Sequence, residues 1–235
     1  MCGIVGGIAQ RNVVPILIEG LKRLEYRGYD SAGLAVVAQK KIFRQREIGK
    51  VKGLEDLINA DPFSGNIGIA HTRWATHGKP SAKNAHPHVC NNKIAIVHNG
   101  IIENHQTLRE AQKEQGYTFT SETDTEVIAH QVYHELESAG SLLQAVKNTI
   151  KYLDGAYALG VISKEDENTL VTCRKGSPLV IGVGFGEYFI ASDVAALLPV
   201  THRFIFLEEG DIAELKIDSL VIYDKDDQIV DRPIK

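Results

Sequence analysis

The spacing of apolar residues in the first hundred positions predicts strands and one helix. The stretch CGIVGGIA, residues 2–9, is short and almost wholly apolar, which is typical of a buried strand. The next stretch, residues 15–28, places Leu17, Leu21 and Leu24 on one helical face. Three further apolar runs predict strands, the last with apolar residues on both faces: 33–37, 67–71 and 93–98.

The second half of the chain predicts two helices and then a block of strands. In TDTEVIAHQVYHELESAG, residues 123–140, Thr123 stands three residues before Glu126, which fits a capping box, and Gly140 suits a helix end. A second helix is predicted over 141–153. Apolar runs then predict strands at 156–163, 169–173, 179–184, 188–192, 203–215 and 220–223.

Together these elements predict one domain, residues 1–235, in which helical layers pack on sheets. No stretch between the elements has the composition of a flexible linker. The last residues, DQIVDRPIK at 227–235, look like the start of a departure from that domain.

Composition and charge narrow the possible partners and compartment. The chain has 235 residues and a net charge of −4, so no global basic field favours nucleic acid. Its densest basic stretch, residues 40–52, is expected to be a solvated strand face or a rim that meets another domain. The 3 cysteines are far apart and odd in number, which indicates a reducing compartment. Because the chain has no signal peptide and no run near ~18 apolar residues, we expect a cytoplasmic protein that does not bind membranes.

The residues best suited to chemistry concentrate between positions 71 and 105. This region holds six of the 9 histidines and the 1 tryptophan. His86 and His88 form an H-x-H with Cys90 nearby, and zinc accepts nitrogen and sulfur ligands. The region lacks a second ligand pair at finger-like spacing, and H-x-H is common in loops. A metal site therefore stays an alternative, and no metal or cofactor is expected.

Cys2 offers a different chemistry, amide hydrolysis by an N-terminal nucleophile. Once Met1 is removed, this residue carries both a thiol and an α-amino group, whose pKa near ~8 lets it accept a proton at physiological pH. The Asn99 side chain and the Gly100 backbone N–H are candidate donors to the oxyanion that forms on attack. The simpler interpretation is that Asn99-Gly100 forms a tight turn and that Cys2 is only packed.

Five strings of residues resemble a known enzyme family. They are MCGIVG, YRGYDSAG, HTRWATHG, HNGIIEN and SETDTE, and they occur in this order in the glutaminase half of the glutamine–fructose-6-phosphate aminotransferases, which are class II glutamine amidotransferases. Others of this class, such as amidophosphoribosyltransferase, share the cysteine and the Asn-Gly pair. The resemblance implies the α+β fold of the N-terminal-nucleophile hydrolases, a four-layer αββα sandwich with two antiparallel sheets.

The resemblance also implies a role for each residue that matches a family motif. Cys2 would attack the side-chain amide of L-glutamine, with Asn99 and Gly100 forming the oxyanion hole. Arg27 would organise the surroundings of the nucleophile. Arg73 and Asp124 would bind the α-carboxylate and the α-ammonium of glutamine, although Asp124 also suits the first turn of a helix. Four more residues match the glutamine-site loop and its surroundings: Trp74, Thr76, His77 and His86.

The same resemblance implies partners for the complete enzyme. A sugar-phosphate isomerase domain with a fructose 6-phosphate site would consume the ammonia, and nothing in this chain matches that half. We expect a homo-oligomer when the enzyme is complete. Two other functions remain open, a metal-dependent amidohydrolase that uses the histidines, and a non-catalytic sensor that binds an amino acid with Arg73 and Asp124.

Overall fold

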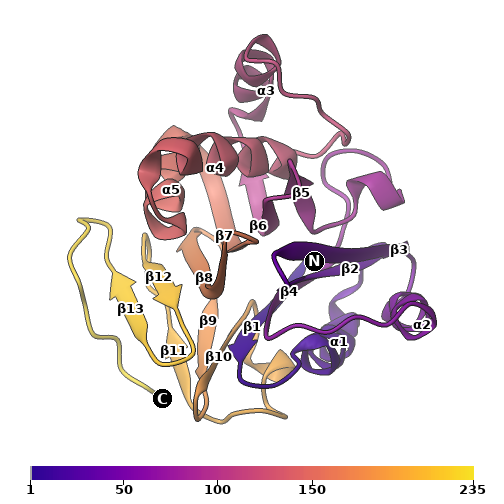
Figure 1. The fold of residues 1–235 in the computed structure, drawn as a ribbon, viewed down its shortest axis with the longest axis vertical. Coiled ribbons are helices and arrows are strands. Elements are labelled where there is room, and N and C mark those ends of the chain that lie inside the picture. Colours follow the sequence, from indigo (N-terminus) through magenta and orange to yellow (C-terminus); the bar gives the residue numbers. More distant parts are fainter. Residues whose placement is uncertain (1) are drawn as a thin grey trace.

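The computed structural model describes residues 2–235 and contains two antiparallel sheets that face one another (Figure 1). The first sheet has seven strands in the order β11-β9-β10-β1-β4-β2-β3. They are β1 (Gly3–Ala9), β2 (Ser31–Ala38), β3 (Lys41–Ile48), β4 (Ile67–Arg73), β9 (Val180–Val183), β10 (Glu187–Ala191) and β11 (Phe204–Phe206). The second has six strands in the order β13-β12-β8-β7-β6-β5. They are β5 (His88–Cys90), β6 (Ile94–Ile102), β7 (Gly155–Ser163), β8 (Asp166–Lys175), β12 (Ile212–Leu215) and β13 (Leu220–Tyr223).

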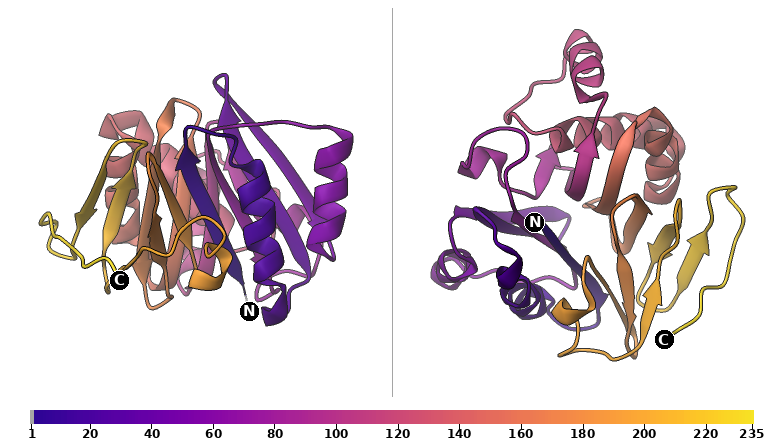
Figure 2. Two further views of the ribbon diagram at one scale, coloured as in Figure 1. Left: turned by 90° about the horizontal axis from the view of Figure 1, so that it is seen from below. Right: turned by 180° about the vertical axis from the view of Figure 1, so that it is seen from behind.

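Helices cover the outer face of each sheet (Figures 1 and 2). Helices α1 (Val14–Arg23) and α2 (Val51–Ala60) pack on β1 to β4, and α4 (Thr125–Ala139) and α5 (Leu142–Thr149) pack on β5, β6 and β8. The short α3 (His105–Glu114) projects from the top of Figure 1 beside α4. The predicted α+β class and its αββα layering are confirmed.

Each strand in the middle of a sheet has apolar side chains on both faces, because each sheet has a layer on both sides. In β1, Val5 packs toward α1 while Ile4 packs toward the second sheet. In β6, Val97 faces the first sheet and Ile96 faces α4. Most of the short apolar runs are therefore buried strands, as predicted. The run predicted over 203–215 instead forms two strands, β11 and β12, and the strand at 220–223 is mostly half-buried.

The helix predicted over 15–28 is shorter in the structure. Helix α1 ends at Arg23, and a 3-10 turn follows over Glu25–Arg27. Gly28 then has a φ of 73°, a conformation that glycine adopts without strain. This turn directs the chain into β2, and it places Arg27 beside Ser192, whose Oγ is 3.4 Å from Arg27 Nη1.

The capping box predicted at Thr123 is wrong. Helix α4 begins after Asp124, whose side chain makes no capping hydrogen bond, and ends at Gly140 as predicted, with a φ of 74°. Glu126 instead reaches further back, where its two carboxylate oxygens accept hydrogen bonds from the backbone N–H groups of Thr120 and Ser121, both at 2.7 Å. The carboxylate therefore binds the loop before the helix rather than the helix end itself.

The predicted departure of the last residues from the domain is also wrong. The segment 227–235, yellow in Figure 1, returns to the first sheet, where Phe204 and Lys235 exchange two backbone hydrogen bonds of 2.9 and 2.8 Å. Arg232 holds the fully buried Asp211 with a bidentate ion pair at 2.9 and 2.8 Å. The chain thus stays packed on the domain as far as its last residue.

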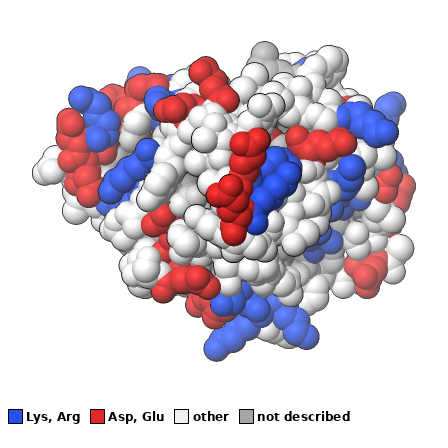
Figure 3. All heavy atoms as spheres, turned by 90° about the horizontal axis from the view of Figure 1, so that it is seen from above, with Lys and Arg blue, Asp and Glu red and all other residues white. Residues whose placement is uncertain are grey.

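Surface charge is mixed rather than one-sided. On the face seen from above, Lys and Arg are interspersed with Asp and Glu (Figure 3). Between residues 2 and 235, no helix has both the length and the apolar character needed to cross a membrane.

Candidate active site

Cys2 lies at the start of the central strand of the first sheet, opposite the end of β4. Because Gly3 pairs with Thr72, the strand register brings Cys2 opposite Arg73, next to Trp74. Its Sγ is 3.3 Å from the Trp74 backbone N–H and 3.5 Å from the Trp74 carbonyl oxygen. Burial raises the pKa of the Cys2 thiol, and the hydrogen bond from Trp74 lowers it by less. At neutral pH this thiol needs a base to become a nucleophile. Met1, whose removal the resemblance implies, lies outside the described residues.

The tight-turn interpretation of Asn99-Gly100 is wrong, because both residues lie inside β6. Asn99 pairs with Ala158 and Gly100 pairs with Tyr157 across to β7. Gly100 has a φ of 133°, and a Cβ there would lie 2.0 Å from the Ala156 carbonyl oxygen, so the site admits glycine alone. Asn99 Nδ2 donates to the carbonyl oxygen of Cys2 at 3.2 Å, which brings the two candidate groups together from different sheets.

An open pocket of about 340 Å³ lies over Cys2. Its lining is Cys2, Arg27, Trp74, Thr76, Asn99, Gly100, Ile101, Ser177 and Pro178. Six of these nine are residues predicted from the sequence. Ile101, Ser177 and Pro178 are additions that the sequence analysis missed, although Ile101 lies within HNGIIEN and Ser177 follows the end of β8.

The remaining predicted residues lie next to this pocket, in a narrower space with room for about one water molecule, about 10 Å³. Its lining adds Arg73, His77, His86, His98, Thr123, Asp124 and Thr125 to residues of the larger pocket. Thus the structure brings all ten predicted site residues to two adjoining spaces. Trp74, at 54%, and Thr76 are the exposed members of this set.

Arg73 and Asp124 are both turned toward protein groups in this structure. Arg73 is 3% exposed, and its Nη2 donates to the carbonyl oxygens of His77 and Gly78, the latter at 2.9 Å. Asp124 is 4% exposed, and its Oδ2 accepts from the Ile102 backbone N–H at 2.9 Å. Arg73 is thus bonded to the 77–78 segment through Nη2, whereas Asp124 is bonded to β6.

Four histidines of this region form a buried cluster: His71, His86, His88 and His98. His71 and His86 stack with their ring centroids 4.1 Å apart, and His88 meets His86 edge-on at 4.7 Å. Burial lowers the pKa of His71 to about 3 and the pKa values of His86 and His88 well below their usual range. Thr125 Oγ1 lies 2.8 Å from His86 Nε2 and 2.9 Å from His98 Nδ1. Within residues 2–235, no three His, Cys, Asp or Glu side chains are arranged to hold a metal ion.

Two arginines of the basic stretch hold the segment that carries His86. Arg46 Nη1 donates to the carbonyl oxygens of Lys83 and Ala85 at 3.1 and 2.9 Å, and Arg44 Nη1 lies 3.4 Å from the Pro87 carbonyl oxygen. Burial lowers the pKa of Arg46 to about 10, which leaves it charged at neutral pH. The expectation of a solvated strand face holds at Arg44, which is exposed, but Arg46 is half-buried.

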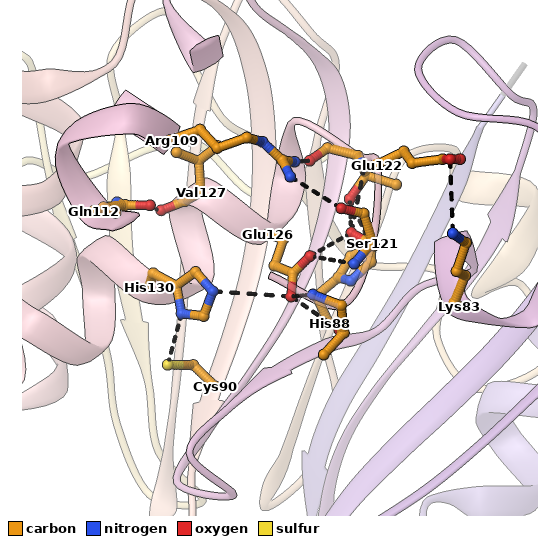
Figure 4. Close-up of polar contacts among 12 residues, drawn as sticks. Lys83, His88, Cys90, Arg109, Gln112, Ser121, Glu122, Glu126, Val127 and His130 are labelled. Carbon is orange, nitrogen blue, oxygen red and sulfur yellow. Dashed lines mark hydrogen bonds and ion pairs between the residues drawn. The ribbon is translucent and has the colours of Figure 1, made fainter. Parts of the chain in front are cut away.

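A second buried network fixes the loop that leads to Asp124 (Figure 4). Arg109 donates to the carbonyl oxygens of Ser121 and Thr123 at 3.0 and 2.6 Å, and Glu126 accepts from Ser121 on the other side. Figure 4 shows the Glu126 carboxylate between this loop and the His130 ring, 3.8 Å away. Asp124 is therefore held by contacts on both flanks before any ligand arrives.

Comparison with known proteins gives relatives over the whole chain. Residues 71–199 match the family model described as a glutamine amidotransferase domain. A protein of Shewanella oneidensis, named glutamine–fructose-6-phosphate aminotransferase [isomerizing], is 57% identical over 235 residues, which are 100% of this chain and 39% of that protein. A protein of the same name from Escherichia coli O6:H1 is 62% identical over 226 residues, or 96% of this chain and 37% of that protein. The chain thus spans about two fifths of the length of these relatives.

Two solved structures share the fold. Glutamine phosphoribosylpyrophosphate amidotransferase from B. subtilis, complexed with ADP and GMP, matches with a TM-score of 0.82 and 24% identity over 97% of this chain and 50% of that one. A structure described as the allosteric regulatory enzyme of purine biosynthesis matches with a TM-score of 0.81 and 26% identity, covering 95% of this chain and 49% of that one.

Proposed function

Since the chain belongs to the glutamine amidotransferase domain family, we propose that it hydrolyses L-glutamine to L-glutamate and ammonia with Cys2 as the nucleophile. The observation that carries this proposal is the meeting of Cys2 with Asn99 and Gly100 at one pocket, with Asn99 Nδ2 3.2 Å from the Cys2 carbonyl oxygen. A thiol and an amide donor are thereby placed on either side of the position where a substrate carbonyl would react.

The proposed reaction has two halves. The α-amino group of the mature Cys2 takes the thiol proton, and the thiolate attacks the side-chain amide carbon. Asn99 and Gly100 hold the negative charge that forms on the amide oxygen. The C–N bond breaks, ammonia leaves with the transferred proton, and a γ-glutamyl thioester remains on Cys2. Water activated by the same amine then releases glutamate and restores the thiol.

Binding of the α-groups follows from the two buried charges. Arg73 provides a guanidinium for the α-carboxylate, and Asp124 provides a carboxylate for the α-ammonium. Because Arg73 bonds to the carbonyl oxygens of His77 and Gly78, glutamine exchanges these contacts for its own carboxylate. Trp74, Thr76, His77 and His86 would then surround the bound substrate, and Arg27 would organise the nucleophile.

We further propose that residues 1–235 act as one glutaminase domain of a longer cytoplasmic enzyme. The support is the name shared by the relatives, glutamine–fructose-6-phosphate aminotransferase, and their greater length. The ammonia would serve the conversion of fructose 6-phosphate to glucosamine 6-phosphate in a sugar-phosphate isomerase domain, within a homo-oligomer. An amidophosphoribosyltransferase role has less support, because the solved structure that bears such a name is only 24% identical.

The experiment is an assay of glutamate release from L-glutamine, with and without a strong chelator, on protein whose intact mass shows that Met1 is removed. We expect release that ignores the chelator and disappears in Cys2→Ala. Release that is lost on chelation would assign the chemistry to the histidines instead. No release from the Met1-free chain would contradict the proposed glutaminase activity of the chain.

A further inference from the structure

His71 contacts the amide of Asn99 across the gap between the two sheets. It lies on β4 of the first sheet, whereas Asn99 lies on β6 of the second. His71 Nε2 is 2.9 Å from Asn99 Oδ1 and 3.0 Å from the His98 carbonyl oxygen. The ring is 0% exposed, so no solvent competes for these contacts.

The backbone carbonyl of His98 decides which ring nitrogen of His71 carries the proton. A carbonyl oxygen can only accept, so Nε2 must be the N–H donor. Nδ1 is then the unprotonated nitrogen, and it has no hydrogen-bond partner among the described residues. Burial lowers the pKa of His71 to about 3, so the ring stays neutral and keeps this single donor at any working pH.

The donor on His71 in turn decides the orientation of the Asn99 amide. An asparagine amide can rotate by half a turn and exchange its oxygen for its NH₂ group with almost no change of shape. Because Nε2–H of His71 is a donor, it can form a hydrogen bond only with the oxygen of the Asn99 amide. Oδ1 of Asn99 therefore points toward His71. Nδ2 then points toward Cys2, where one hydrogen bonds to the Cys2 carbonyl oxygen at 3.2 Å and the second remains for another acceptor.

We propose that His71 is a positioning residue for the reaction. It holds the Asn99 amide in the orientation whose NH₂ group points toward Cys2, so that the oxyanion hole presents a hydrogen-bond donor rather than the amide oxygen. This inference rests on the proposed glutaminase function. His71 itself touches neither the thiol nor the substrate position, and it transfers no proton. The effect on kcat passes through Asn99, whereas the stacking of the His71 ring on His86, at 4.1 Å between centroids, is a packing contact.

The test is a double-mutant cycle on the Met1-free chain, with kcat and KM for glutamine as readouts. In the otherwise unchanged chain, His71→Leu should lower kcat by about tenfold to a hundredfold and leave KM within about twofold. The expected loss follows from the effect of removing one oxyanion donor, which lowers kcat by a factor of about 10²–10³. In the Asn99→Ala background the same change should lower kcat by less than about twofold, since no amide is left to orient. Thr149→Val is the control for loss of a buried polar side chain, because Thr149 is also 0% exposed and donates to the Ala145 carbonyl oxygen in α5, away from both pockets.

The conservative variant provides a second test that does not depend on the folding of His71→Leu. Glutamine places its NH₂ group near the position of a histidine Nε2, whereas asparagine ends near Nδ1. His71→Gln should therefore retain most of kcat and His71→Asn should lose it. Equal losses in these two variants, or the same loss from His71→Leu in both backgrounds, would overturn the role of His71 alone. A rate in the unmodified chain no greater than that of Cys2→Ala would overturn the glutaminase proposal and this inference with it.

Discussion

Asn99 Nδ2 and the Cys2 carbonyl oxygen are joined by a hydrogen bond of 3.2 Å that links the two sheets at the nucleophile. Cys2 precedes the central strand of one sheet, and Asn99 lies near the end of a strand in the other. The spacing between thiol and amide donor therefore depends on how the two sheets pack. Each prediction below uses a contact of this kind, in which a side chain depends on a partner distant in the sequence.

Loss of the Asn99 amide should slow turnover without weakening substrate binding. Asn99→Ala removes a hydrogen-bond donor to the charge that develops only in the transition state. Such a donor stabilises the transition state by about 3 kcal/mol. We expect kcat for glutamate release to fall by a factor of hundreds while KM changes little. Asn104→Ala is the control, because Asn104 bonds the Tyr152 carbonyl oxygen outside the pocket. Near-normal turnover in Asn99→Ala would remove Asn99 from the oxyanion hole.

Asp124→Asn should weaken glutamine binding more than it slows chemistry. The asparagine keeps an oxygen to accept from the Ile102 backbone N–H, as Asp124 does at 2.9 Å, but loses the charge that would pair with the α-ammonium. Losing one partner of a buried charge pair costs about 2–5 kcal/mol, so KM should rise by roughly a hundredfold. Steady-state kinetics with glutamine give the answer, and an unchanged KM would contradict the assigned role.

Iodoacetamide should label Cys2 alone in the native chain. Cys2 is half-buried at a pocket, whereas Cys90 and Cys173 are each 1% exposed. Because burial raises the pKa of the Cys2 thiol, little thiolate is present at pH 7, and the labelling rate should climb about tenfold per pH unit toward pH 9. Intact mass would show one added group in the native chain and three after unfolding. Labelling of Cys2→Ala under native conditions would show that a buried thiol is accessible after all.

Gly100→Ala should destabilise the chain far more than Gly116→Ala. Both glycines have left-handed backbone, with φ of 133° and 92°. A Cβ at Gly100 meets the Ala156 carbonyl oxygen at 2.0 Å, whereas a Cβ at Gly116 meets nothing within 4 Å. Strain alone should cost Gly116→Ala about 1 kcal/mol, and overlap should add about 1–3 kcal/mol or more at Gly100. Urea unfolding of both variants measures the difference, and equal losses would refute the steric argument.

Stability should fall as the pH drops below the ordinary histidine range. The folded chain holds His71 at a pKa of about 3, and the unfolded chain binds its proton near 6.5, so protonation favours unfolding between these values. This contribution to stability is thus fully present above about pH 6.5. Protonation of His71 in the unfolded chain should lower the free energy of unfolding by about 2 kcal/mol between pH 7 and pH 5. His71→Gln should lose less on the same change of pH. Urea unfolding at both pH values tests this, and parallel losses in the two proteins would contradict it.

The sequence predicted the buried strands well and the polar elements poorly. Runs such as GIVGGIA are apolar on both faces because each central strand lies between two layers. Strand β3 escaped prediction because it is an edge strand whose Arg44 and Arg46 alternate with half-buried residues. Helix α3 escaped because it buries only Gln112 among its ten residues. Local pattern has no information on such elements, whose partners lie elsewhere in the chain.

The candidate site was predicted as a set of residues but not as an arrangement. The sequence named ten of the sixteen residues that line the two pockets, nine of them within the motif strings and His86 outside them, and their roles remain predictions until they are assayed. Spacing along the chain could not show that Asn99 lies inside a strand or that His71 reaches it from the other sheet. The capping-box prediction was wrong for the same reason. Glu126 accepts hydrogen bonds from the backbone N–H groups of Thr120 and Ser121 rather than from the helix end.

The strand order of the first sheet has a consequence for the making of the protein. Strand β1 is synthesised first, yet it pairs on one side with β4 and on the other with β10, which ends at Ala191. One edge of β1 therefore stays open until most of the chain has left the ribosome, and an open edge can pair with other chains. Such distant pairing also forms slowly. During this interval Ile4, the second residue of β1, also lacks its two hydrogen bonds with Ser192, the residue that follows β10.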